Sequence, residues 1–369
     1  MCPLRHKQAL RMLILRIECP FRKEQKAMAG DTTRVLIESI VRKALRDIQD
    51  SPERTVRNLV DMAQHFAKGR FQQHFFEAAQ RLLENENSPY YALVQDVAHH
   101  VDPDRLMAFG INVGYNGCTL GAKTIRETEE AEGYNIPWAI TLHLKSEVLN
   151  RKTEHYQRTI AKGERLGIHT WFLVCHDEPL DALELVSAHP ASAFVMFFPK
   201  EYASHRLLEQ AMELKHLMLA VQFDENDTQL CTEMREMGML YAVYDEYTDD
   251  TAADILSGER IWAIQQLHPH ITVLIGAAGC HEKTKHQVYR YVAESREKHF
   301  YQTIPWEFTL DNRYVDTVIS GDACSAGFTS SGQLYTLNEI KQNDVYSLFG
   351  NDLSDILKKA FPKERNGHD

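Results

Sequence analysis

The sequence lacks several features that would place it in a common class at once. No apolar run approaches the roughly 20 residues that a membrane-spanning helix needs. No Gly-x-Gly-x-x-Gly follows any predicted strand, and no Walker motif occurs, so the common nucleotide-binding fingerprints are missing. Basic residues are outnumbered, with 41 Lys and Arg against 52 Asp and Glu and a net charge of −11. This balance argues against broad affinity for nucleic acids or anionic membranes.

Cysteine is also sparse for 369 residues. The seven cysteines are odd in number and form no short repeat, and no secretory signal is visible. We therefore expect reduced thiols and a cytoplasmic location. The cysteines are Cys2, Cys19, Cys118, Cys175, Cys231, Cys280 and Cys324.

The N-terminus is basic, but its apolar stretch at residues 12–15 is too short and too interrupted by Arg for a signal peptide. Three interpretations of residues 1–27 stay open. The segment is an extension from an upstream start codon, with Met28 as an alternative start, or an amphipathic arm on the fold, or a targeting segment. We treat residues 1–30 as an N-terminal extension, ordered or disordered.

Residues 31–105 are predicted to form an all-helical domain. Apolar residues recur at helical spacing through 37–48, Ser51-Pro52 and Ser88-Pro89 are helix starts, and a third helix is expected over residues 71–83. Asp102-Pro103 closes the domain. Its aromatic residues are expected to pack against the domain that follows.

From residue 106 to 320, short apolar runs alternate with amphipathic helices. Continuous apolar strands of this kind indicate a parallel sheet that is covered on both faces. The fold class is therefore α/β, and we predict a (β/α) TIM-type barrel of six to eight parallel strands, with an open doubly wound sheet as the alternative. The eight predicted strands are 109–115, 138–144, 169–176, 193–199, 217–224, 240–247, 272–277 and 306–311.

Residues 321–369 differ from the repeating units. Cys324-Ser325-Ala326-Gly327 leads into short alternating runs on either side of Ser331-Gly332, which predicts a β-hairpin. A closing helix is expected near 353–361.

Active sites of parallel barrels lie on the loops that follow the strands, so polar residues at strand ends are the candidates. We predict catalytic roles for His143, Asp177 and Asp245. The predicted ligand-binding residues are Asn112, Asn116, Cys118, Lys200 and Asp224.

Cys-His pairs occur after the third and seventh predicted strands. Thiolate and imidazole suit zinc or another borderline metal. Cys175, His176, Cys280 and His281 could therefore supply two to four metal ligands if those strands face each other.

Four glycines, Gly110, Gly114, Gly117 and Gly121, recur around the first predicted strand and its turn. A glycine-rich turn that enters a helix can present backbone N–H groups to an anion. The alternative is that the turn needs glycine for close packing.

These residues resemble the radical SAM superfamily, in particular the branch with a C-terminal SPASM-like extension. The resemblance covers about residues 106–345. It rests on the Asn-Gly-Cys118 turn after a strand, on the repeating β/α units, and on the Cys324-Ser-Ala-Gly run before a hairpin. It implies a barrel with a small-molecule pocket.

The departures from the family pattern are large. The family's Cys-x3-Cys-x2-Cys motif becomes Cys118, Ala122 and Ile125, and one thiolate cannot hold a 4Fe–4S cluster. Leu144-Lys145-Ser146-Glu147 stands where we expected the family's Gly-Gly-Glu run, and no cysteine follows Tyr335 in the hairpin. A cluster held by Cys118, Cys280 and Cys324 from separate loops is a further alternative.

We therefore predict a radical-SAM-like barrel that has lost its cluster and binds a small nucleotide-like or peptide-like ligand at the mouth of the strands. S-adenosylmethionine or a divalent metal are the cofactors left open. The alternatives are a metal-dependent hydrolase or lyase that uses Cys, His and Asp at strand ends, and an accessory protein that binds a partner through its helical domain. Whether the protein is an enzyme, and whether it forms a homo-oligomer, the sequence does not decide.

Overall fold

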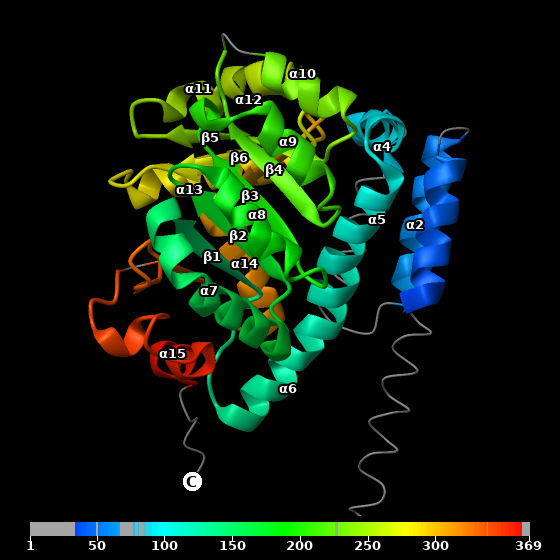
Figure 1. The fold of residues 1–369 in the computed structure, drawn as a ribbon. Coiled ribbons are helices and arrows are strands. Elements are labelled where there is room, and N and C mark those ends of the chain that lie inside the picture. The colour runs from blue at the N-terminus through cyan, green and yellow to red at the C-terminus, as the bar shows by residue number, and fades with distance from the viewer. Residues whose placement is uncertain are drawn as a thin grey trace, which may run out of the picture.

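The computed structural model describes residues 34–48, 51–66, 77, 80, 84–85, 87–225, 228–337 and 339–363 (Figure 1). The predicted N-terminal extension and most of the predicted third helix lie outside these residues. Within the described residues, no helix is long and apolar enough to cross a membrane.

One nine-stranded sheet forms the centre of the molecule. Its strand order is β7-β6-β5-β4-β3-β2-β1-β8-β9, with β1 to β8 parallel and β9 antiparallel to β8. The strands are β1 (Ala139–Leu144), β2 (Thr170–Cys175), β3 (Ala193–Phe198), β4 (Leu217–Gln222), β5 (Tyr241–Tyr247), β6 (Ile271–Gly276), β7 (Ile304–Glu307), β8 (Ala326–Phe328) and β9 (Leu334–Tyr335). The α/β class, the parallel strands and the C-terminal hairpin are confirmed. The sheet is a curled, partial barrel that stays open between β7 and β9.

Helices cover the sheet on two sides (Figure 1). The outer face packs against α7 (Ser146–Leu166), α8 (Ala182–Ser187), α9 (His205–Met212), α10 (Gln229–Glu236) and α15 (Leu353–Ala360). Near β5 to β7 the outer helices are α11 (Ala252–Leu256), α12 (Glu259–Gln265) and α13 (Glu282–Glu297). The inner face packs against α4 (Pro89–His100), α5 (Pro103–Ile111) and the start of α14 (Phe308–Ser320). Residues 34–47 and α2 (Pro52–Phe66) complete the N-terminal helices, and short 3-10 turns occur at Pro179–Asp181, Lys200–Tyr202 and Asp344–Tyr346.

Side chains alternate between the two faces as strand geometry requires. In β3, Phe194 and Met196 join the outer cluster, whereas Val195 and Phe197 join the inner one. Because both clusters are buried, the strands read as continuous apolar runs, which is why seven of the eight strand predictions fall on or across a real strand. The eighth predicted strand covers only the end of β7 and continues into α14.

The predicted first strand, 109–115, is wrong. These residues belong to an unbroken helical run that comprises α5, a π-helix (Asn112–Gly121) and α6 (Ala122–Glu132). Met107, Ile111 and Tyr115 recur every four residues and form a buried stripe against the helix over residues 34–47. The glycines between these positions made a helical stripe look like a short strand. Helices therefore extend to residue 132, and the sheet begins only at β1.

This run, here called the amino-edge helix (Pro103–Glu132), lies along the amino ends of the strands. Just before it, the Asp102 N–H donates to Gly238 O (2.9 Å), three residues before β5 begins at Tyr241. The buried Arg105 guanidinium donates to four carbonyls between Ala211 and Leu217, ahead of β4. Asn112 donates to Pro190 O and Ser192 O, ahead of β3.

The same helix continues past the starts of β2 and β1. A Cβ atom on Gly121 would lie 2.2 Å from Gly167 O, so only glycine permits this approach to the turn before β2. Further on, the Glu129 carboxylate accepts from the Ile136 N–H (2.8 Å), three residues before β1. One helix thus fixes where five consecutive strands begin.

The outer edge of β7 cannot pair with a further strand. Pro305 has no N–H, and its carbonyl accepts from Arg296 Nη1 (2.7 Å). The Glu307 N–H donates to Asp311 Oδ2 (2.8 Å), and Arg296 forms two bonds to the same carboxylate. Since the outward backbone groups already have partners, β7 cannot template another strand, and the sheet ends here instead of closing into a barrel.

Glu307 itself makes the stability of the fold depend on pH. Its carboxyl group is fully buried and accepts from the Leu310 N–H (2.6 Å) and the Tyr247 hydroxyl (2.8 Å). Burial raises the pKa of Glu307 to about 7, and the two hydrogen bonds oppose this rise. Because the folded protein then binds a proton that the unfolded chain releases near pH 4.5, stability falls as the pH rises from about 5 to 8.

We expect Glu307→Gln to remove much of this loss, because the amide mimics the neutral acid. The gain at pH 8 should be on the order of 2–3 kcal/mol, as a shift of roughly two pKa units implies. Buried Asp316, whose pKa burial also raises to about 7, leaves part of the slope in place. Urea unfolding at pH 5 and pH 8 measures the difference, with exposed Glu130→Gln as the control. A variant that is less stable than the parent at pH 8 would contradict this assignment.

Candidate functional site

The inner face of the sheet is buried at its amino half and open at its carboxyl half. Along β5, Ala242 and Tyr244 are buried but Glu246 is exposed, and along β4 Ala220 is buried but Gln222 is exposed. The α4, α5 and α14 side chains pack on the buried positions of the inner face, and Val174 and Ile275 are partly buried at the edge of the same cluster. We call the open part the carboxyl-edge surface. It comprises His143, Val174, Gln222, Glu246 and Ile275, with His176 at its rim.

Two imidazoles and a phenol form a chain at one side of this surface. His143 Nδ1 lies 2.9 Å from His176 Nε2, and the two rings are stacked. His143 Nε2 lies 3.1 Å from the Tyr335 hydroxyl. The three residues come from β1, from the position after β2, and from β9, so the chain joins three strands.

Strand geometry explains why these side chains meet. His143 shares the inner face of β1 with Ala139 and Thr141, four and two residues earlier. Tyr335 pairs with Gly327 across the β8–β9 hairpin, and a Cβ on Gly327 would lie 2.3 Å from the Tyr335 ring. Because Gly327 has no side chain, the phenol ring crosses β8 and reaches His143.

The chain is uncharged at neutral pH. Burial, and secondarily the nearby His176, lowers the pKa of His143 to about 4. Burial and Lys145 lower the pKa of His176, while Asp177 and Glu246 oppose this shift. Burial raises the pKa of Tyr335 to about 12. A neutral imidazole donates at one nitrogen and accepts at the other, so His143 links the phenol to the exposed His176 and can relay a proton between them.

Of the three predicted catalytic residues, only His143 lies on the carboxyl-edge surface. Asp177 accepts from the Ser146 N–H (2.8 Å) and hydroxyl, which caps the first turn of α7. Asp245 alternates to the opposite side of β5 from Glu246 and pairs with Arg260 (3.4 Å). Both aspartates therefore serve local structure.

The predicted ligand-binding residues are divided between the two edges of the sheet. Lys200 and Asp224 form an ion pair after β3 and β4, at the carboxyl edge as expected. Asn112, Asn116 and Cys118 lie instead on the amino-edge helix, where Asn116 donates to Ala191 O (2.9 Å). Their predicted placement is wrong because the strand that should have carried them is a helix. Among the glycines around them, Gly121 is required for close packing, whereas a Cβ atom on Gly110 or Gly114 would meet nothing within 4 Å.

The predicted metal ligands do not assemble. Within the described residues, no group of three or more His, Cys, Asp and Glu side chains is arranged to hold a metal ion. Cys175 is buried in the outer cluster, whereas the next residue, His176, turns to His143, since neighbouring side chains point to opposite faces. Cys280 and His281 follow β6, four strands away from β2, or roughly 19 Å along a sheet.

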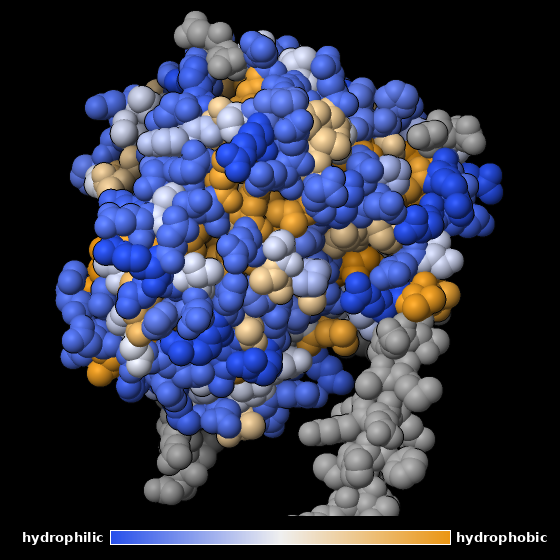
Figure 2. Space-filling model, viewed as in Figure 1, coloured by the Kyte–Doolittle hydropathy of each residue, from blue (hydrophilic) through white to orange (hydrophobic). Residues whose placement is uncertain are grey.

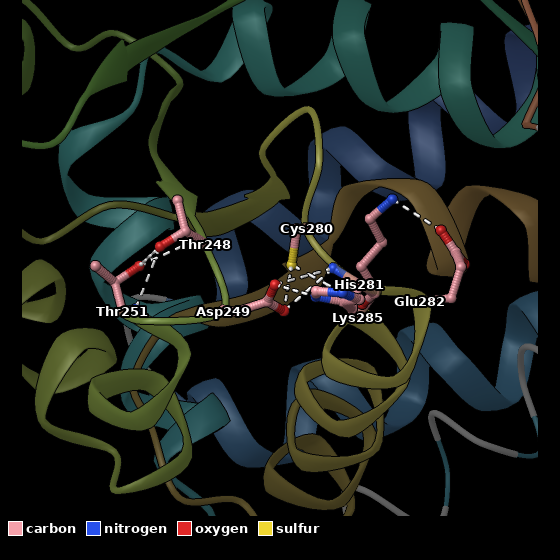
Figure 3. Close-up of polar contacts among 7 residues, drawn as sticks. All are labelled: Thr248, Asp249, Thr251, Cys280, His281, Glu282 and Lys285. Carbon is pink, nitrogen blue, oxygen red and sulfur yellow. Dashed lines mark hydrogen bonds and ion pairs between the residues drawn. The ribbon is translucent and has the colours of Figure 1, made fainter.

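Cys280 and His281 instead bind one carboxylate. Figure 3 shows Asp249, from the loop after β5, between the Cys280 thiol (3.6 Å) and the His281 backbone and ring. Hydrogen bonds from Thr284 and His281 lower the pKa of exposed Asp249 to about 2. Because His281 precedes the first turn of α13, Asp249 acts as a cap for that helix.

The three cysteines considered as cluster ligands from separate loops, Cys118, Cys280 and Cys324, do not lie together. Cys118 and Cys324 lie before β2 and β8 at the amino edge, and Cys280 lies beyond β6 at the carboxyl edge, about 20 Å away along a six-residue strand. The segment after the real first strand, 145–166, contains no cysteine.

Sequence reasoning missed Tyr335 and Gln222 as members of this surface, and at the end of β5 it chose Asp245 instead of its polar neighbour Glu246. The signal for Tyr335 was its position across the Ser331-Gly332 turn from Gly327, which is where a large ring fills the space that a strand glycine leaves. For Glu246 the signal was alternation, because Ala242, Tyr244 and Glu246 share one face of β5.

Comparison with known proteins gives a distant structural likeness. No protein-family model matches the chain, and no curated protein matches it in sequence. Among solved structures, three of SuiB from Streptococcus suis are similar: bound to S-adenosylmethionine, bound to the precursor peptide SuiA, and SuiB itself. Identity is 11–12% and the TM-score 0.45–0.46. The match covers 64% of this chain and 66–68% of SuiB, about two thirds of its length. At this score the likeness supports no conclusion about activity.

The hydrogen-bonded chain can be tested by titration. We expect the His143 imidazole to remain neutral down to about pH 4, because burial disfavours its charged form. The unfolded chain protonates this residue near pH 6.5, so its contribution to stability is lost as the pH falls from 6.5 to 4. NMR of ring-labelled histidine, assigned with His143→Gln, reads the pKa directly. In Tyr335→Phe the His143 resonances should shift, whereas those of exposed His205 should not. A His143 pKa near 6.5 would refute the buried chain.

Proposed function

We propose that this protein is a cluster-free, radical-SAM-like partial barrel that binds a small nucleotide-like or peptide-like ligand on the carboxyl-edge surface. The main support is that the inner face of the sheet is packed at its amino half, whereas several of its positions at the carboxyl half are exposed or partly exposed. Gln222 and Glu246 are exposed there, and Val174 and Ile275 are only partly buried, so both polar and apolar groups stay within reach of a ligand.

The polar groups on this surface support recognition of a small, polar ligand. Gln222 supplies an amide, Glu246 a carboxylate and His176 an exposed imidazole, all around the apolar Val174 and Ile275. A few polar groups above an apolar floor are typical of small-molecule sites. His176 can also exchange a proton with the ligand, since the His143–Tyr335 chain behind it buffers the change in its hydrogen bonding.

The metal-dependent hydrolase or lyase receives less support. Its candidate ligands are divided between the outer cluster, the His143 chain and the cap of α13. The ligand-binding proposal needs none of these residues to move.

A thermal-shift screen of the full chain tests this proposal. The probes are nucleosides, nucleotides, S-adenosylmethionine and short peptides. We expect at least one class to raise the Tm, because a ligand that binds only the folded state stabilises it by mass action. His176→Ala and Gln222→Ala should each weaken that ligand about tenfold or more, the cost of losing roughly one good hydrogen bond. Exposed His205→Ala on α9 is the matched control.

A screen without any stabilising compound would count against the site, as would equal binding by the parent and both site variants. The same protein, reconstituted anaerobically with iron and sulfide, should retain no bound iron and develop no cluster absorption. Retention of a stoichiometric cluster would overturn the cluster-free part alone.

A further inference from the structure

A cavity lies among the N-terminal helices, outside the carboxyl-edge surface. It measures about 310 Å³ and lies between the helix over residues 34–47, α4 and α5, which are neighbours in the fold (Figure 1). Its lining consists of Arg42, Leu45, Arg46, Ala98, Pro103 and Met107. This volume is at the lower end of the range for small-molecule sites.

The cavity interrupts what would otherwise be one packed layer. On one side, Leu45 and Ala98 belong to a cluster with Ile48, Val56 and Tyr91. On the other side, Met107 belongs to a separate cluster with Ile111 and Tyr115. The cavity is open to solvent beside Arg42, Arg46 and Pro103, which are exposed, so its apolar floor lacks protein contacts on that side. A ligand that continues the layer would join the two clusters.

The charges at the cavity specify the sign of that ligand. Arg42 and Arg46 are one helical turn apart, and like charges at this spacing repel. Arg42 pairs with Asp104 (3.0 Å), and both side chains are more than half exposed. Among the residues that the structure describes, Arg46 has no ionic or hydrogen-bonding partner. The mouth thus carries one positive charge in excess over an apolar floor.

We propose that this cavity binds an aliphatic carboxylate of medium chain length. The chain lies on Leu45, Ala98 and Met107, and the carboxylate accepts hydrogen bonds from Arg46 and the outer nitrogens of Arg42. Guanidinium groups match a carboxylate in geometry as well as charge, which favours this head group over an alcohol or an amine. The site is independent of the ligand proposed for the carboxyl-edge surface.

Calorimetric titration of the full chain with decanoate tests the proposal, with decanol as the uncharged probe of equal length. We expect saturable decanoate binding and at least tenfold weaker binding of decanol. Arg46→Gln should weaken decanoate at least tenfold and leave decanol unchanged. Ala98→Leu, which fills the cavity, should abolish the binding of both without lowering the Tm. Arg158→Gln, an exposed change on α7, is the matched control.

Absence of saturable decanoate binding overturns the proposal, as does decanol binding of equal strength. Unchanged decanoate binding in Arg46→Gln overturns it too. If Ala98→Leu folds poorly, the Arg46→Gln titration alone tests the proposal. His176→Ala, which changes the carboxyl-edge surface, should bind decanoate as the parent does. A failure of the cavity proposal is therefore distinguishable from a failure of the proposed function.

Discussion

The fold depends on a buried arginine that binds backbone carbonyls instead of a carboxylate. The Arg105 guanidinium donates from Nη1 to Leu214 O and Leu217 O, and from Nη2 to Ala211 O and Met212 O, at 2.8–3.3 Å. The last carbonyls of α9 have no partners within their own helix, and a cation suits the negative end of the helix dipole. Burying the charge is costly, so these bonds must hold together. They fix the start of β4 to α5.

That anchor gives the two edges of the sheet different roles. The amino-edge helix touches the segments ahead of β5, β4, β3, β2 and β1 in turn, through Asp102, Arg105, Asn112, Gly121 and Glu129. No comparable element in the described residues crosses the carboxyl ends on the inner face, where Gln222 and Glu246 are exposed. The contacts that fix the strands are therefore concentrated at the amino edge, and the carboxyl edge, where parallel barrels carry their active sites, is the one that we propose binds a ligand. The face in Figure 2 is largely hydrophilic, and apolar residues show in a band near its middle.

The sequence predicted the sheet better than the site. Strands buried on both faces, such as β3, are continuous apolar runs and were placed within a few residues.

Residues 109–115 were misread because an apolar run with glycines does not separate a strand from a helix, and the distinguishing contacts, Met107 and Ile111 with Ile37 and Val41, are tertiary. Because of that error, the cysteine motif was sought at residue 118, whereas the segment after the first strand of the structure begins at residue 145. His143 was found because it ends a strand, but its partner Tyr335 is 192 residues away and only the hairpin register brings it there. The sequence does not indicate that the barrel stays open, because the contacts of Pro305, Arg296 and Asp311 that end the sheet follow no local pattern.

Amide hydrogen exchange of the native protein tests the central claim most directly, that residues 112–121 belong to a helix that organises the amino edge. These amides should exchange as slowly as those of β2 and β3, because opening them requires the strand starts to separate as well. The amides at 177–178 and 249–250 on the carboxyl edge should exchange much faster. Exchange of residues 112–121 at the rate of an unstructured loop would contradict this account.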